Sequence, residues 1–256
     1  MEPRFSAVAG VFADMHKFFV GGDAISGNRI VFSGNDAHHI SFSLRMKPGE
    51  RIIAVTEDGK NCLCTLESFG DGAVTAVIDD VTQSDSEPPV RIRLFQALPK
   101  GDKLETVIQK AVECGAAEIV PFESSCCIAK IRDPEKKLIR LNRIACEAAK
   151  QCGRGIVPRV MPPLSFREAV TAAAEDDLAI FCYENERAKK LGEVLKSDSS
   201  DTISVIVGPE GGFSPDEVRF AEENGLTVTG LGTRILRCET APVFVLSCIS
   251  FVRELC

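Results

Sequence analysis

The sequence has few histidines and no apolar run of membrane length. Its three histidines, His16, His38 and His39, all lie within the first forty residues, which excludes a histidine-based zinc site or a Ser-His-Asp triad in the later chain. No secretory signal pattern opens the chain. The eleven cysteines include no CxxC pair, which indicates reduced thiols rather than a disulfide framework. We therefore expect a cytoplasmic protein with no membrane partner and no metal.

Two nucleotide-binding fingerprints, GxxxxGK[ST] and GxGxxG, are also absent, which argues against a nucleotide-dependent enzyme. The formal net charge of −7 over 256 residues, taken as an average, argues against a nucleic-acid partner. That average hides a local excess, because residues 130–159 contain nine Lys or Arg and three acids. Such a segment is either a solvated helix face or a contact surface for a phosphate backbone.

The two halves of the chain differ in pattern. Residues 50–82 contain short apolar or alternating runs separated by turns at Asp58-Gly59 and Gly70-Asp71-Gly72, which predicts a small β-rich, barrel-like domain. Residues 84–89 are polar and end in two prolines, as is typical of a linker. From residue 90 onward, strand and helix patterns alternate, which predicts a parallel α/β sheet.

Three helix starts are predicted by capping-box patterns at Asp102, Ser165 and Ser214, each followed three residues later by a glutamate. A short helix is also expected over residues 36–44. The strands expected in the second half are 90–97, 118–122, 178–183, 202–207 and 226–229, and two further helices are expected over 135–152 and 239–253.

Three loops follow strands of the predicted sheet, where parallel α/β proteins bind ligands. They are residues 97–101, 208–213 and 230–241. The glycines of the second loop permit close approach of a ligand to the backbone, and Glu210 suits a cationic or hydroxyl-bearing ligand. Arg234 and Arg237 of the third loop suit an anionic ligand. The alternatives are a tight turn before a capped helix, and an arginine pair that is solvated or bridged to Glu239.

These loops, in this order, resemble those of the SPOUT class of RNA methyltransferases. The wider pattern is similar to the RsmE family of 16S ribosomal RNA uridine-N3 methyltransferases. The segments that carry the resemblance are residues 36–40, 44–50, 103–115, 147–154, 208–212 and 231–241. The usual family opening is best matched at Met15-His16-Lys17-Phe18-Phe19, so residues 1–14 are expected to be an N-terminal extension. Cys126 stands where the family commonly has an arginine, which leaves one substrate contact in doubt.

The resemblance implies a PUA-like β-barrel that binds RNA over residues 15–83, a linker over 84–89 and a methyltransferase domain with a trefoil knot over 90–256. It implies a homodimer that uses S-adenosylmethionine to methylate N3 of a uridine in 16S ribosomal RNA, either free or in the assembled small subunit. It places the cofactor against Leu98, Val207, Gly208, Pro209, Glu210, Gly211, Leu231, Gly232, Ile235 and Leu236.

Methyl transfer needs alignment of donor and nucleophile more than a metal, and positive charge from Arg234 or Arg237 would stabilise a uridine anion. Glu239 is a candidate base, or simply a helix N-terminal residue favoured by the dipole. Within this resemblance, the residues expected to contact RNA are Lys17, Arg45, Arg143, Lys150 and Arg154. The rival functions are ribose 2′-O-methylation by another SPOUT enzyme and RNA binding by a knotted protein without catalysis.

Overall fold

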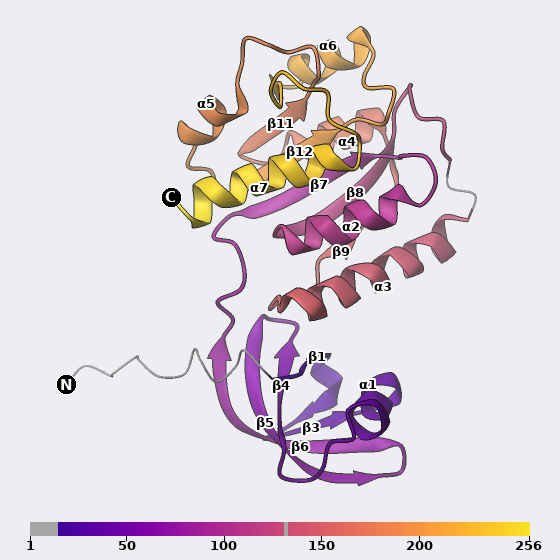
Figure 1. The fold of residues 1–256 in the computed structure, drawn as a ribbon, viewed down its shortest axis with the longest axis vertical. Coiled ribbons are helices and arrows are strands. Elements are labelled where there is room, and N and C mark those ends of the chain that lie inside the picture. The colour runs from indigo at the N-terminus through magenta and orange to yellow at the C-terminus, as the bar shows by residue number, and fades with distance from the viewer. Residues whose placement is uncertain (1–14, 131–132) are drawn as a thin grey trace, which may run out of the picture. The chain divides into compact units, whose positions relative to one another are not determined.

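The computed structural model describes residues 15–130 and 133–256, and they form two compact units (Figure 1). The first unit runs to Glu87 and also contains Gly153–Val157, while the second contains Pro88–Cys152 and Pro158–Cys256. The expected extension over residues 1–14 lies outside the described residues. Among the helices of the described residues, none combines the length and hydrophobicity needed to cross a membrane.

The first unit is built on one six-stranded sheet of order β1-β4-β5-β6-β3-β2. β1 runs parallel to β4, and the remaining neighbours are antiparallel, so the expected β-rich domain is confirmed. The strands are β1 (Lys17–Val20), β2 (Ile25–Ser26), β3 (Arg29–Phe32), β4 (Arg51–Thr56), β5 (Lys60–Gly70) and β6 (Ala73–Gln83). The helical elements are η1 (Gly22–Ala24), α1 (Gly34–His38) and η2 (His39–Ser43).

Alternation of side chains along β3 produces the core of this unit. Ile30 and Phe32 are buried while Arg29 is exposed, as expected for a strand with one face against a core. The ring of Phe32 meets Phe18 of β1 edge-on, with 5.7 Å between centroids. The single helix expected over residues 36–44 is instead the α-helix α1 followed by the π-helical turn η2.

The second unit is built on a seven-stranded sheet of order β10-β8-β7-β12-β11-β13, with β9 paired to β8. Every pair in it is parallel, as the alternating pattern predicts. Its strands are β7 (Arg91–Ala97), β8 (Ala116–Glu123), β9 (Arg159–Val160), β10 (Leu164–Ser165), β11 (Leu178–Cys182), β12 (Thr202–Val207) and β13 (Thr227–Thr229). Its helices are α2 (Lys103–Glu113), α3 (Pro134–Cys152), α4 (Phe166–Ala173), α5 (Leu191–Lys196), α6 (Pro215–Glu223) and α7 (Thr240–Glu254).

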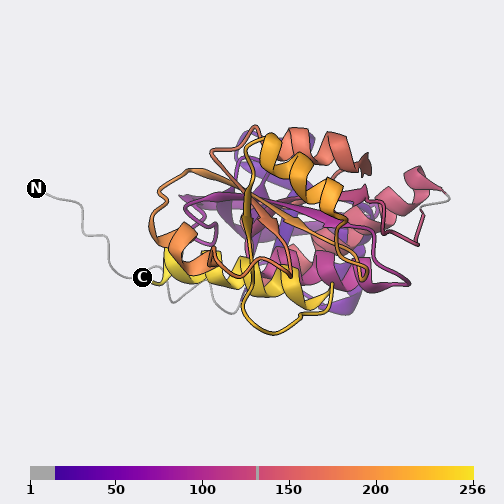
Figure 2. The ribbon, with the colours of Figure 1, turned by 90° about the horizontal axis from the view of Figure 1, so that it is seen from above.

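Helices cover both faces of this sheet. Figure 2 shows α4 and α6 on one face and α2 and α7 on the other, and α2 also packs against α3. The side of α2 facing the sheet buries Leu104, Ile108 and Val112, at the helical spacing that the sequence predicts. The core under α4 and α6 joins Val170 to Phe181 of β11.

Two of the three predicted capping boxes are confirmed. The hydroxyls of Ser165 and Ser214 each accept the backbone N–H three residues later, and the glutamates there bond back. The helix start predicted at Asp102 is confirmed, because α2 begins at Lys103, but the capping box is not, because the Asp102 side chain makes no capping hydrogen bond. Its backbone is not extended, and the carboxylate of Glu105, the expected partner, pairs instead with Lys137 and Arg140 of α3.

Candidate functional site

A cavity of about 320 Å³ lies where β11 and β12 end at one edge of the parallel sheet. The loops after these strands and the loop between β13 and α7 form its walls. Both predicted catalytic arginines, Arg234 and Arg237, line it. Eight of the ten predicted cofactor residues also line it: Val207, Gly208, Pro209, Glu210, Leu231, Gly232, Ile235 and Leu236. The structure thus brings together residues from two sequence-distant loops, as expected at this edge.

Three predicted site residues lie elsewhere. Leu98 is buried and lines a second cavity beside α2 and α3. Gly211 lies against Cys126, where an added Cβ would be 3.1 Å from the Cys126 Cβ. Glu239 lies directly before α7 and is not among the described residues that line the first cavity.

Outside the three predicted loops, sequence reasoning missed four residues of the first cavity: Lys103, Cys182, Tyr183 and Glu184. The signal for the last two was present, because they follow an apolar run and ligands bind beyond the ends of such strands. Lys103 was read only as part of a helix start. Its role depends on a carboxylate more than a hundred positions away in the sequence, which no local pattern reveals.

Glycines keep the loop after β12 tight against its neighbours. A Cβ on Gly208 would lie 3.0 Å from the ring of Phe213. Gly212 has a φ of +66°, and a Cβ there would collide with the carboxylate of Glu184. Larger residues at these two positions would therefore reshape the cavity wall.

Lys103 joins the two loops through a pair of carboxylates. Its Nζ lies 3.0 Å from Oε1 of Glu210 and 3.3 Å from Oε2 of Glu239. Glu210 also accepts the backbone N–H of Lys100 at 3.2 Å, and the Cys238 thiol donates to Glu239 at 3.1 Å. The α2 N-terminus, the glycine loop and the α7 N-terminus are therefore held by one polar network.

This network fixes the charge state of its members. Burial acts to raise the pKa of Glu210, but hydrogen bonds from Lys103 and from backbone N–H groups outweigh it and lower the pKa to about 2. The hydrogen bond to Glu210 raises the pKa of Lys103. Burial, together with the neighbouring carboxylates, raises the pKa of the Cys238 thiol to about 12. At neutral pH the network around Lys103 therefore holds two carboxylates, one ammonium and a neutral thiol.

Glu239 is poorly suited to the role of a base. The hydrogen bond from Cys238 and the contacts with Lys103 lower the pKa of its carboxyl. A carboxylate with a lowered pKa is a weaker proton acceptor than an ordinary one. The contacts give Glu239 a structural role, in orienting Lys103 and the start of α7.

Replacing Lys103 with Met should raise the pKa of Glu210 from about 2 toward the ordinary 4.5, because the main favourable charged partner is removed. In the unaltered protein, the ionised Glu210 carboxylate stabilises the folded state because its pKa is lower there than in the unfolded chain. This contribution to the free energy of unfolding is complete above pH 4.5 and is lost as the pH falls toward 2. Titration of the isotopically labelled Glu210 carboxyl checks this. The matched control is Lys110→Met, which removes a lysine of the same helix whose partner is Glu113 rather than Glu210. An unchanged pKa of Glu210 in the Lys103 variant would contradict the expectation.

The cavity suits a nucleoside that carries groups of both charges. Val207, Leu231 and Leu236 supply apolar surface for a base and ribose. The wall also holds the carboxylates of Glu184 and Glu210 and the cations Lys103, Arg234 and Arg237. S-adenosylmethionine combines these features, since it joins an adenosine to a sulfonium and an amino-acid group. Within residues 15–130 and 133–256, no cluster of three metal-ligating side chains is found.

The five predicted RNA contacts have different surroundings. Arg45 is exposed, with a φ of +55°, and Arg143 is exposed on α3, paired with Glu147. Lys150 is half-buried on α3. Lys17 donates to the carbonyl of Gly153 at 2.9 Å within the first unit.

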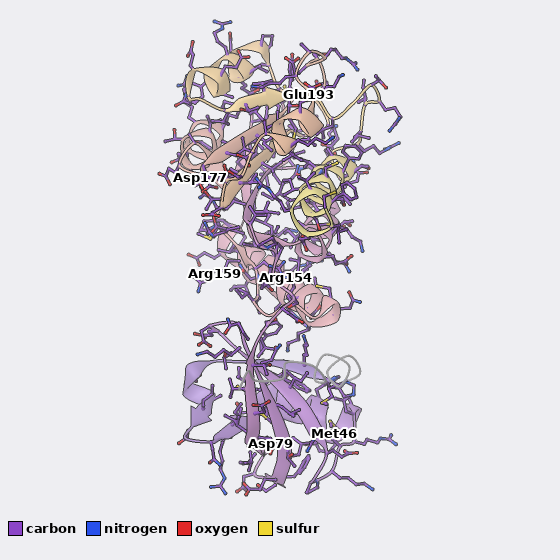
Figure 3. The ribbon with its side chains drawn as sticks, turned by 90° about the vertical axis from the view of Figure 1, so that its left-hand side faces the viewer. Met46, Asp79, Arg154, Arg159, Asp177 and Glu193 are labelled. Atoms are coloured by element: carbon purple, nitrogen blue, oxygen red, sulfur yellow. The ribbon has the colours of Figure 1, made fainter. Side chains whose placement is uncertain are left out.

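Arg154, which follows the end of α3 (Figure 3), is buried. Its guanidinium holds the carboxylate of Glu87 at 2.6 Å. These contacts of Lys17 and Arg154 lie within the first unit, because Gly153 and Glu87 both belong to it. The contact of Arg154 with RNA stays a prediction of the family resemblance.

Comparison with known proteins identifies the family. An RNA methyltransferase domain model matches residues 86–250, and an RNA methyltransferase PUA domain model matches residues 32–79. The ribosomal RNA small subunit methyltransferase E of Bacillus subtilis is 37% identical over 233 residues, which cover 87% of this chain and 90% of that protein. The protein of the same name from Synechocystis is 30% identical over 245 residues, which cover 95% and 80%.

A solved structure agrees with these matches. The crystal structure of a ribosomal RNA small subunit methyltransferase E from Neisseria gonorrhoeae bound to S-adenosyl methionine superposes with a TM-score of 0.83 at 32% identity, covering 92% of this chain and 97% of that one. The α/β sheet and the β-rich first unit are those that the sequence predicts. The chain belongs to the RNA methyltransferase family that includes the ribosomal RNA small subunit methyltransferase E proteins.

Proposed function

We propose that this protein transfers a methyl group from S-adenosylmethionine to N3 of a uridine in the 16S RNA of the small ribosomal subunit, and that it does so in the cytoplasm. The observation that carries the proposal is the pair Arg234 and Arg237 in the wall of a cavity built from the glycine loop and the loop before α7. The B. subtilis and N. gonorrhoeae relatives support the substrate and the cofactor by their names and by the bound ligand.

The bound cofactor supplies an electrophilic methyl group. The chain's own residues prepare the nucleophile, because uridine N3 must lose its proton before it can attack. Arg234 and Arg237 are both exposed in the cavity wall, where their guanidinium groups would stabilise the anion spread over N3 and the adjacent carbonyl oxygens. The N3 proton would leave to solvent. N3 would then bond to the methyl carbon while the sulfur–methyl bond breaks, and its electron pair would return to the sulfur, which leaves as the neutral thioether S-adenosylhomocysteine. This route needs no protein base, which agrees with the lowered pKa of Glu239.

A homodimer is part of this proposal. Phe251 near the end of α7 is 57% exposed, and Leu255 just beyond it is 76% exposed. Ile235, between the two site arginines, is 80% exposed. The dimer is implied by the family resemblance, and these exposed apolar side chains are available to its interface. The trefoil knot of the loops around the cavity stays a prediction of the family resemblance.

Nucleoside analysis tests the proposed reaction. Purified protein, S-adenosylmethionine and unmodified small-subunit RNA or subunits should yield 3-methyluridine after digestion to nucleosides. A 2′-O-methylated ribose would show that the rival SPOUT activity is correct. Failure of the purified protein to bind S-adenosylmethionine in calorimetry would favour the rival without catalysis.

A further inference from the structure

A second cavity, of about 430 Å³, lies beside the first within the same unit. Its floor is apolar and comes from Leu98 and Pro99 after β7 and from Leu104 of α2, all of which are buried. Its rim is cationic, with Lys136, Lys137 and Arg140 of α3 and Lys130 before it, against one acid, Asp133. An apolar floor with a cationic rim matches a nucleotide, which has a flat base and an anionic phosphate.

Glu105 of α2 holds two of the cationic side chains on the rim in place. Glu105 of α2 lies 2.8 Å from the Lys137 ammonium through one carboxylate oxygen and 2.8 Å from the Arg140 guanidinium through the other. One carboxylate cannot neutralise two cations, so the rim keeps a net positive charge. A guanidinium has five N–H donors, and its pairing with Glu105 leaves donors for a phosphate oxygen.

The two cavities share a wall. Lys103 lines the first and the next residue, Leu104, lines the second. The backbone N–H of Lys100, in the loop that forms the floor, donates to Glu210 of the first cavity. A polynucleotide that places one nucleotide at Arg234 therefore has the second cavity beside it, across the segment 98–104.

We propose that the second cavity binds a nucleotide of single-stranded RNA adjacent to the methylated one, with its base on Leu98, Pro99 and Leu104 and its phosphate on Lys136 and Arg140. This inference rests on the proposed function for its substrate class. It assigns a role in RNA binding to the basic segment over residues 130–159 of this otherwise acidic chain. It also explains the position of Leu98, which faces this cavity rather than the first one. Packing of a base on this aliphatic floor involves no base-specific hydrogen bond and should therefore tolerate different bases, whereas the phosphate contacts are sensitive to salt.

Binding of short single-stranded RNA measured by fluorescence anisotropy tests the proposal. The double variant Lys136→Ala/Arg140→Ala should weaken binding by about tenfold or more at moderate salt, and it should lower the salt dependence by about one or two released ions. Affinity for S-adenosylmethionine should be unchanged. The matched control is Arg219→Ala, because Arg219 is an exposed arginine of α6 that pairs with Asp216 and is not among the described residues that line this cavity.

The base is tested separately from the phosphate. Oligonucleotides that carry one abasic position next to the target uridine should bind the unaltered protein more weakly than intact oligonucleotides do. For the double variant, the affinities of abasic and intact oligonucleotides should differ little. Equal weakening by Arg219→Ala, or equal weakening of polyphosphate and RNA binding by the double variant, would overturn the proposal in favour of a diffuse anion surface. Cavity-dependent RNA binding by a protein that forms no 3-methyluridine would instead overturn the proposed reaction and leave this site standing.

Discussion

Replacing Arg234 with Ala should slow methyl transfer by about 10²–10³-fold, the usual loss when one group that stabilises developing negative charge is removed. Arg234 lines the first cavity and is exposed, so its removal leaves no buried group without a partner and the fold should be unchanged. Single-turnover methyl transfer to small-subunit RNA measures the chemical step. Circular dichroism of the same sample checks the fold.

The pH dependence of this variant separates charge stabilisation from simple positioning. If Arg234 stabilises the uridine anion, the lost rate should recover in part at high pH, where more of the uridine is ionised in solution. The matched control is Arg219→Ala, an exposed arginine of α6 paired with Asp216, which should turn over normally. Near-normal turnover by Arg234→Ala, or a loss that does not change with pH, would remove Arg234 from the proposed role.

The parts of the fold that follow from local chemistry could be predicted from the sequence. Hydrophobic spacing located α2, and serine with a glutamate three residues on located the starts of α4 and α6. The same pattern correctly predicted the start of α2 after Asp102 but not its hydrogen bonds, because Glu105 pairs with Lys137 and Arg140 of α3. The glutamate of a capping box can instead pair with any cation that the fold brings near it. Such cations lie far away in the sequence, so the local pattern cannot predict them.

The candidate site shows the same division. The glycine loop and the arginine loop were predicted because both follow strands of one parallel sheet. Lys103 was missed because its importance comes from Glu210 and Glu239, which only the fold places beside it. The return of Gly153–Val157 to the first unit was missed for the same reason. Its anchor is Glu87, within a segment whose polar composition predicted only a linker.

Replacing Arg154 with Met should lower the free energy of unfolding of the first unit by about 3 kcal/mol, because loss of one partner leaves a largely buried charge on the other. The side chains of Arg154 and Glu87 are 5% and 22% exposed, and Glu87 also accepts the backbone N–H groups of Gly155 and Ile156. Urea unfolding followed by circular dichroism, which suits a chain without Trp, and hydrogen exchange of β5 amides measure the loss.

A second substitution should restore most of this stability. In Glu87→Gln/Arg154→Met the charge is gone, while the Gln carbonyl can still accept the two backbone N–H groups, so the double variant should be markedly more stable than Arg154→Met alone. The matched control is Arg143→Met, which removes an exposed pair with Glu147 and should cost at most about 0.5 kcal/mol. A similar small cost for Arg154→Met, or no recovery in the double variant, would show that the ion pair does not hold Gly153–Val157 in the first unit.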